Sequence, residues 1–479
     1  MNKTKNMSDH TASANIGVRV FLTVMAVLIM VLIVCGVLSY FIPQGSFERD
    51  EAGIILTDTY HESEISGIAP WRVLTAPIRV FASEDSLTII MISIFLLVMS
   101  GIFNLLQQTG GIQIFIERII RKLGTRRKSV VCFTVLIFML FGSFFGMFEE
   151  LVALLPIVIL MMLSLKMDTM TGLGTCLLAA CFGFSAAITN PFSVGLAAQI
   201  IEHPLSSGIW LRIVFFAMTY VTLCAFLILH LRKIRKNPKA SPTYETDLAK
   251  QQVMEAMPSP TESSDKIFRV YAVFFSIQAV LLLLIASVRA ISALAIPILT
   301  ISFLVCGIIS GLLVCQKKRK VAVHIVMGAV SMIPAVVIIA VASSVKLVMM
   351  ESGIMDTIMY RVITVLDGKN QFLAIFLIYL LILFLQVFIG SASAKLLLVM
   401  PIVMPVATAI GLSPSIIILA YCMADGFTDV ILPTNPVLLI GLSMANVSYG
   451  KWVKWTWKLQ AVLLLLTVAV LFFGVAIGY

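Results

Sequence analysis

The chain has 479 residues, of which 60% are hydrophobic and only 12% are charged, with a mean hydropathy of +1.05. Ordinary soluble domains are about a quarter charged, so this composition excludes a soluble globular protein. Apolar runs long enough to cross a bilayer recur from end to end, which predicts an all-α polytopic membrane protein. The net charge of +10 comes largely from basic residues in short loops between these runs. The positive-inside rule explains such charges without a nucleic-acid partner.

The N-terminal segments alternate between the two sides of the membrane. Residues 1–17 are polar and are expected to form a cytoplasmic tail, and 18–43 should be an uncleaved first span. Residues 44–86 carry eight acidic residues against three arginines, which places them outside. A span at 87–107 then leads to a basic cluster that belongs at the cytoplasmic surface.

Residues 129–165 form two apolar arms around a polar tip at 146–150. Each arm has about 17 residues, the lower limit for a spanning helix. Two ordinary spans joined by a loop would fit the same charges. The short arms and the short connection favour a re-entrant hairpin whose tip stops near the middle of the membrane.

The next segment, 170–203, is too long for one straight helix and is interrupted by a Thr-Asn-Pro sequence at 189–191. Proline removes a backbone donor and clashes with the preceding turn, so a broken transmembrane helix is expected. A span at 208–231 completes a first half, 18–231. Residues 232–266 are rich in Pro, Ser, Glu and Lys, which indicates a flexible cytoplasmic linker.

The second half, 267–479, has the same kinds of segment. A re-entrant hairpin at 371–411, with its tip at 390–394, precedes a broken helix at 414–447. Its ordinary spans are predicted at 267–288, 291–315, 324–347 and 459–478. Nine full spans and two hairpins place every basic cluster on one side, with the second half inverted relative to the first.

One sequence offset relates the two halves. Pro156 precedes Asn190 by 34 residues, and Pro401 precedes Asn435 by the same 34, so both landmarks repeat after 245 residues. Two inverted repeats, each with a hairpin and a broken helix, are typical of secondary transporters. The two tips and two breaks are therefore expected to meet around a substrate.

The first tip carries Glu149 and Glu150 within an apolar run. Carboxylates inside a membrane usually face a cavity or a partner, although a cytoplasmic loop would hold the same pair without cost. Lys395 stands 245 residues after Glu150, so an ion pair between the two tips is one hypothesis. The alternative is a lysine that snorkels outward.

The remaining candidate residues lie in the second tip and in the breaks. Asp425 and Asp429 are spaced i, i+4 on one helical face. Together with the tip glutamates they predict an acidic site, suited to a cationic or amine-bearing substrate or to coupling to H⁺ or Na⁺ near Asn190 and Asn435. The full set of candidate binding residues is Glu149, Glu150, Thr189, Asn190, Ser391, Ser393, Asp425, Asp429, Thr434 and Asn435.

No other chemistry is indicated. The eight cysteines lie in or beside apolar segments without metal-ligand spacing, and the five histidines form no cluster, so neither a cofactor nor a bound transition metal is expected. An enzyme would need a nucleophile–base or metal constellation, which the sequence does not offer. An ion channel would not need two inverted hairpins.

Four motifs resemble the YfcC-type basic amino acid antiporters of the anaerobic dicarboxylate carrier family. They are the Gly-Met-x-Glu-Glu tip at 146–150, the Thr-Asn-Pro-Phe break at 189–192, Asp-Gly-Phe at 425–427 and Ile-Leu-Pro-Thr at 431–434. The resemblance implies a bacterial inner-membrane transporter of arginine, lysine or ornithine, by exchange or ion coupling. A carrier of dicarboxylates or other organic anions is the alternative within this class.

A more distant resemblance to the ion transporter superfamily implies the mode of action. Members of that superfamily combine a scaffold domain with a mobile transport domain that works as an elevator, usually in a homodimer. The candidate residues fall in the tips and breaks of that plan.

Overall fold

The computed structural model describes residues 18–48, 59–63, 67–83, 86–111, 114, 127–201, 204, 207–255, 264–287, 294–315, 317–366 and 368–479. The predicted tail at 1–17 lies outside these residues. The described part is almost entirely helical. Its one small sheet pairs β1 (Gln44–Ser46) with β2 (His61–Ser63) in antiparallel register.

In the described part of the chain, seven helices are long and apolar enough to cross a membrane, which agrees with the predicted all-α membrane protein. They are Ile89–Gln108, Arg127–Phe145, Ile209–Lys236, Ile296–Val314, Lys318–Glu351, Ala392–Ala409 and Tyr449–Ala476. The same part of the chain also contains shorter apolar helices of 10–17 residues.

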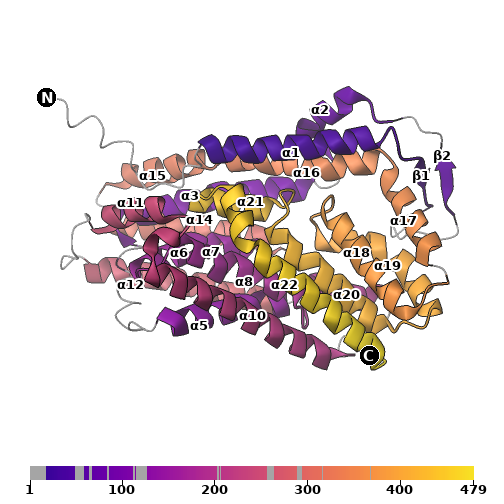
Figure 1. The fold of residues 1–479 in the computed structure, drawn as a ribbon. Coiled ribbons are helices and arrows are strands. Elements are labelled where there is room, and N and C mark those ends of the chain that lie inside the picture. Colours follow the sequence, from indigo (N-terminus) through magenta and orange to yellow (C-terminus); the bar gives the residue numbers. More distant parts are fainter. Residues whose placement is uncertain are drawn as a thin grey trace.

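A first group of helices precedes each hairpin region. In it, α3 packs against α14 and α15, while α1 and α2 pack against α16. Figure 1 shows α1 and α16 side by side along the upper edge of the molecule. The members are α1 (Val18–Leu38), α2 (Pro70–Arg79) with η1 (Val80–Ala82), α3 (Ser86–Gln108), α12 (Ser264–Ser287), α14 (Ala295–Val314), α15 (Lys318–Ser331), α16 (Ile333–Glu351) and α17 (Ile354–Leu366).

A second group contains the predicted tips and breaks. Within it α5 packs on α8, α18 packs on α20, and α8 crosses α20. From the first half it takes α5 (Arg127–Phe145), η2 (Glu150–Leu154), α6 (Leu155–Ser164), α7 (Thr169–Leu173), η3 (Gly174–Leu178), α8 (Ala179–Ser185), η4 (Pro191–Gly195), α9 (Leu196–Ile200) and α10 (Ile209–Lys236). From the second it takes α18 (Gln371–Gln386), α19 (Ala392–Ala409), α20 (Pro414–Phe427), η6 (Thr428–Val430), α21 (Pro436–Ala445) and α22 (Tyr449–Ala476).

Both long segments with an Asn-Pro sequence are interrupted in the structure. The first unwinds between α8, which ends at Ser185, and η4, which starts at Pro191. The second unwinds between η6 and α21, which starts at Pro436. In each case proline occupies the first helical position, where its missing N–H costs nothing, and the preceding asparagine is the N-cap.

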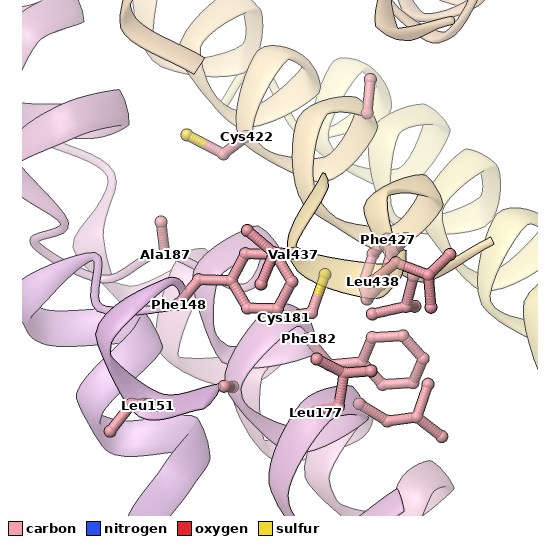
Figure 2. Close-up of a cluster of buried hydrophobic side chains, with 14 of the residues drawn as sticks. Phe148, Leu151, Leu177, Cys181, Phe182, Ala187, Cys422, Phe427, Val437 and Leu438 are labelled. Atoms are coloured by element: carbon pink, nitrogen blue, oxygen red, sulfur yellow. The ribbon is translucent and has the colours of Figure 1, made fainter. Parts of the chain in front are cut away.

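The two halves meet where α8 crosses α20 (Figure 2). The rings of Phe182 and Phe427 pack edge to face there. The Cys181 thiol donates to the Gly426 carbonyl at 2.9 Å, and the Ser185 hydroxyl donates to the Cys422 carbonyl at 3.0 Å. A Cβ atom at Gly426 would lie 2.5 Å from Ser185, so the glycine permits the close approach of the helices.

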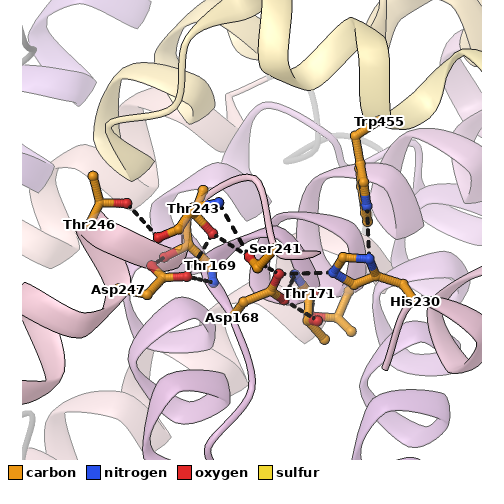
Figure 3. A network of polar contacts seen from close by, with 10 residues as sticks. Asp168, Thr169, Thr171, His230, Ser241, Thr243, Thr246, Asp247 and Trp455 are labelled. Carbon is orange, nitrogen blue, oxygen red and sulfur yellow. Dashed lines mark hydrogen bonds and ion pairs between the residues drawn. The ribbon is translucent and has the colours of Figure 1, made fainter. Parts of the chain in front are cut away.

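The linker differs from the flexible tether that its composition indicated. Helix α10 continues to Lys236, and η5 (Pro238–Ala240) and α11 (Tyr244–Glu255) follow it. Three linker side chains, Ser241, Thr243 and Asp247, are buried. They belong to a polar network with the start of α7 (Figure 3), so residues 232–255 are folded onto the bundle.

Candidate functional site

A cavity of about 350 Å³ lies where both predicted tips and the second break approach α3, α14 and α16. Pockets of this size hold small molecules. The tips and breaks contribute Gly146, Phe148, Glu149, Phe192, Gly390, Ser391, Ala392, Ser393, Asp429, Thr434, Asn435 and Pro436. The facing wall is made of apolar side chains with Ser343 and Lys346 of α16.

The first tip is tied to the first break through Ser143 near the end of α5. Its carbonyl accepts the backbone N–H groups of Ile188, Thr189 and Asn190, at 3.1, 3.3 and 3.1 Å. The Thr189 hydroxyl donates to the Phe144 carbonyl at 3.1 Å, so it turns toward the same helix end. These bonds satisfy unwound backbone groups that could not remain unpaired in a membrane.

Gly146 makes the turn at this tip with φ of 68°, a conformation that favours glycine. Glu149 follows and lines the cavity. Glu150 is the first residue of η2, and its side chain is not among those that the structure describes.

The two asparagines act as helix caps. Asn190 Oδ1 accepts the Phe192 N–H at 2.9 Å, and Asn435 Oδ1 accepts the N–H groups of Val437 and Leu438 at 2.9 and 3.3 Å. Asn435 lines the cavity, whereas Asn190 is fully buried behind it. Asn435 Oδ1 thus has two donors, whereas Asn190 Oδ1 has one and keeps a lone pair.

The second tip reaches the first break. Ser391 caps α19 by accepting the Ala394 N–H at 3.4 Å, and the Ser393 hydroxyl donates to the Phe192 carbonyl at 3.4 Å. Both serines line the cavity. The tip of one half thus contacts the break of the other.

Lys395 forms an ion pair with Asp425, while its predicted pairing with Glu150 involves a side chain that the structure does not describe and stays a hypothesis. The Nζ–Oδ1 distance is 2.5 Å, and both side chains have no exposed surface. The Tyr421 hydroxyl donates to the Ala392 carbonyl at 2.5 Å, which holds the first turn of α19 against α20 and directs Lys395 toward Asp425.

The two aspartates of the second broken helix therefore have different roles. Asp425 lies behind the cavity wall with its charge balanced by Lys395. Asp429, in η6, lines the cavity and accepts a hydrogen bond from the Gln386 side chain. Of this pair, Asp429 is the carboxylate that a molecule in the cavity would meet.

Two polar residues of the site escaped the sequence analysis. Gln386 ends α18 and bonds Asp429, and Lys346 of α16 lines the opposite wall. Each stands in an otherwise apolar helix, and such positions are rarely occupied by polar residues without a function. A search for polar residues within apolar helices would have identified both Gln386 and Lys346.

Buried polar atoms without a hydrogen-bond partner among the described residues gather around the breaks. They include Asn190 Nδ2, Ser193 Oγ, Gln386 Oε1, Thr428 Oγ1 and Thr434 Oγ1. Orphaned groups are uncommon in the interiors of proteins. Their concentration here is consistent with a site that accepts a small polar molecule or an ion. No group of three or more His, Cys, Asp or Glu side chains that could hold a metal occurs within the described residues.

The chain is a polytopic membrane protein, because several of its helices are long and apolar enough to span a membrane and they surround a cavity with polar tips. The profile of the C4-dicarboxylate anaerobic carrier (DcuC) family matches residues 21–476, and the chain therefore belongs to this family of membrane transporters. The family resemblance read from the tip and break motifs is confirmed.

Two relatives cover most of the chain. It is 26% identical over 406 residues to a protein of Escherichia coli (strain K12) named "Putative basic amino acid antiporter YfcC", covering 82% of this chain and 79% of that protein. It is also 26% identical over 386 residues to an uncharacterized protein of Haemophilus influenzae, covering 80% and 75% of the two chains.

Two solved structures are similar over nearly the whole chain at low identity. The Alcanivorax borkumensis YdaH transporter is 17% identical, with 96% and 98% of the chains covered and a TM-score of 0.43. Neisseria gonorrhoeae MtrF is 17% identical, with 94% of each chain covered and a TM-score of 0.40.

Proposed function

We propose that this transporter moves basic amino acids such as arginine, lysine or ornithine across the bacterial inner membrane, by exchange or by coupling to H⁺ or Na⁺. The observation that carries the proposal is the 350 Å³ cavity between the tips, the second break and α16. Among the described residues, its lining includes the carboxylates of Glu149 and Asp429 and the ammonium group of Lys346. An amino acid with a cationic side chain carries both kinds of charge that such groups can bind.

Helix ends add to this complementarity. The N-terminal turns of α19 and α21, capped by Ser391 and Asn435, line the cavity. Helix N-termini attract anions, so they and Lys346 suit the α-carboxylate of an amino acid. Asp429 and Glu149 suit its cationic groups. The name of the relative in Escherichia coli points to the same substrate class.

The transport mechanism that we propose is an elevator built on two inverted repeats. Equivalent helices pack in the same pairs in the two halves, α5 on α8 and α18 on α20. In this scheme 129–165 and 371–411 are re-entrant hairpins, and the segments 170–203 and 414–447 are the broken helices. The helices before each hairpin form the scaffold, and a homodimer would hold that scaffold in place.

The orientation in the membrane follows from the basic residues. Arg127 and Lys128 at the start of α5 line the same cavity as Arg232, Arg235 and Lys236 at the end of α10. These two predicted cytoplasmic clusters are therefore at one end of the bundle, which supports a cytoplasmic linker and a cytoplasmic N-terminus.

Carriage of C4-dicarboxylates is the competing function, since the family description names that substrate. A dicarboxylate would be drawn to Lys346 and to the two helix N-termini. A dicarboxylate has no cationic group to offer the Glu149 and Asp429 carboxylates, so we propose the cationic substrate first.

Exchange in proteoliposomes distinguishes the two substrates. Vesicles loaded with unlabelled arginine should take up labelled arginine, and external lysine or ornithine should compete while succinate and fumarate should not. Uptake of labelled succinate against internal succinate, with no arginine exchange, would replace the proposal by dicarboxylate transport.

A variant ties the activity to the cavity. Asp429→Asn should reduce arginine exchange about tenfold or more, because hydrogen bonds to charged groups contribute about 1.5–3 kcal/mol. Glu245→Gln, which removes an exposed carboxylate from the first turn of α11, is the matched control and should leave exchange unchanged.

A further inference from the structure

A second and larger cavity, of about 840 Å³, lies at the linker end of the bundle. It is bounded by the start of α5, the turn after α6, the end of α10, and the linker with α11. Six cationic side chains line it, namely Arg127, Lys128, Lys166, Arg232, Arg235 and Lys236. None of these residues lines the cavity assigned to the transported substrate.

The two acids in its wall are already engaged by the protein (Figure 3). Asp168 accepts four hydrogen bonds, from the Thr171 N–H and hydroxyl, from the Ser241 hydroxyl and from His230 Nε2, at 2.6–2.9 Å. Four bonds match the full capacity of a carboxylate. Asp247 accepts from the Thr169 N–H at 2.9 Å and from the Thr243 hydroxyl at 2.6 Å.

The same network fixes the protonation of His230. Its Nδ1 accepts the indole N–H of Trp455 at 3.1 Å, and an indole can only donate. Nε2 therefore carries the hydrogen that is shared with Asp168. Burial raises the pKa of Asp168, but the bonds from His230, Ser241 and Thr171 outweigh this effect and hold it below its ordinary value. Asp168 is thus an ionised residue whose oxygens are occupied by hydrogen bonds within the protein.

Five of the six cations that line the cavity, all except Lys166, have no comparable partner among the described residues. Among the described residues, no carboxylate forms an ion pair with Arg127, Lys128, Arg232, Arg235 or Lys236. Because like charges gathered around one cavity repel each other, a multivalent anion bound among them would be stabilised.

Lys166 provides an independent observation. It has φ of 58°, a left-handed conformation that is unfavourable for a lysine. Its N–H bonds the Leu163 carbonyl and the next N–H bonds the Met162 carbonyl, which closes α6 with a Schellman turn. The same turn closes α19, where Gly411 takes the equivalent place 245 residues later with φ of 88°. Of these two equivalent turns, the one beside the basic cavity holds a lysine and the other holds a glycine.

We propose that this cavity binds a phosphate-bearing anion. Guanidinium groups match phosphate oxygens in a two-bond geometry, and lysines add charge. The same cavity also has an apolar part of its wall, formed by Leu231, Ile234 and Leu248. A phosphate ester with an apolar group would therefore match both the cationic and the apolar lining. That chemistry is offered by an anionic phospholipid headgroup at the membrane surface and by a soluble phosphate compound of the cytoplasm.

Binding to the purified full chain tests the proposal in two arms. The soluble arm titrates inorganic pyrophosphate at constant ionic strength and measures the dissociation constant by calorimetry. The lipid arm compares the unfolding temperature in nanodiscs of phosphatidylcholine alone with that in nanodiscs containing cardiolipin. We expect binding in one arm, and that arm identifies the source of the phosphate.

Two variants locate the site. Lys166→Gly removes one charge from a turn that glycine prefers, so the protein should fold at least as well while it binds about tenfold more weakly. Arg235→Gln/Lys236→Gln should weaken binding further. Lys318→Gln/Arg319→Gln removes two cations from the start of α15, outside the cavity, and should leave binding unchanged. Binding in neither arm, or equal losses in the cavity variants and the α15 control, would overturn the proposal.

Discussion

Phe182 and Phe427 pack edge to face, with ring centroids 5.2 Å apart and planes at 74°, at the point where α8 crosses α20 (Figure 2). The two residues are 245 positions apart, as are Cys181 and Gly426, which are hydrogen-bonded beside them. In a two-fold arrangement, only residues on the axis contact their own counterparts. Contacts between residues 245 positions apart are therefore expected along the two-fold axis of the proposed inverted repeat.

Gly426→Ala should destabilise this crossing. The new Cβ would lie 2.5 Å from Ser185 Cβ and 2.7 Å from two backbone atoms of the same residue, so the helices would have to separate. Gel filtration of the detergent-solubilised variant should show loss of folded protein. Gly450→Ala, at a helical position with nothing within 4 Å, is the control and should fold normally. Equal behaviour of the two variants would contradict the close packing.

The Lys395–Asp425 pair predicts a characteristic pattern of stabilities. Removing one member, as in Lys395→Ala or Asp425→Ala, leaves a buried charge and should cost about 3–5 kcal/mol. Replacing both, as in Lys395→Met/Asp425→Leu, should restore most of that loss because no charge then remains unpaired. Thermal unfolding of the three variants measures the effect. A double variant as unstable as the sum of the single variants would exclude the ion pair.

The two tips should respond differently to the same substitution. Gly146→Ala forces alanine into φ of 68° and places its Cβ 2.6 Å from the Phe192 ring, beside the Asn190 side chain. The left-handed conformation alone costs about 1–2 kcal/mol. We expect strongly reduced transport. Gly390→Ala, where nothing lies within 4 Å of the new Cβ, should retain transport, and identical losses at both tips would argue against this difference.

The role of Asn435 as the N-cap of α21 can be tested separately from any role of its amide group in transport. Asn435→Ala removes the acceptor for two backbone N–H groups and should destabilise the protein by about 1 kcal/mol. Asn435→Ser keeps a capping oxygen without adding a second charge beside Asp429, so it should retain most of the stability. Comparing unfolding temperature with exchange rate for both variants tests this. If the serine variant is as unstable as the alanine variant, the cap is not the stabilising contact.

The docked linker predicts local protection of α11. Asp247 accepts bonds from Thr169 and Thr243, and Asp247→Ala leaves three donors without their acceptor. Hydrogen exchange of the α11 amides should accelerate in this variant while exchange in α20 stays slow. The exposed neighbour Glu245→Gln provides the control. Unchanged exchange in α11 would show that other contacts hold the linker.

Much of the candidate site could be predicted because its residues are polar in an apolar sequence. Glu149, Ser393 and Asp429 stand out in this way, and all three line one cavity. Their role in substrate binding remains a prediction. Partners were harder to predict, because a repeat offset identifies equivalent positions and only residues at the axis touch their equivalents. Glu150 and Lys395 are equivalent, but Lys395 is bonded to Asp425.

The linker was misinterpreted for a different reason. Its composition is that of a flexible segment, whereas its order depends on hydroxyl and carboxylate bonds to residues about 70–80 positions away, such as Ser241 to Asp168. Composition carries no information on such contacts. The acids Glu245 and Asp247 in the first turn of α11 were a local signal for a helix start.

The docked linker fastens both halves of the chain at one end. Asp247 bonds Thr169 in the first half, and the Lys250 ammonium donates to the Ala445 carbonyl in the second half at 3.0 Å. The linker therefore forms hydrogen bonds with both segments that contain an interrupted helix. In the elevator mechanism that we propose, residues 232–255 would therefore move together with these helices, and the flexible connections between the two moving bodies would lie in other segments of the chain.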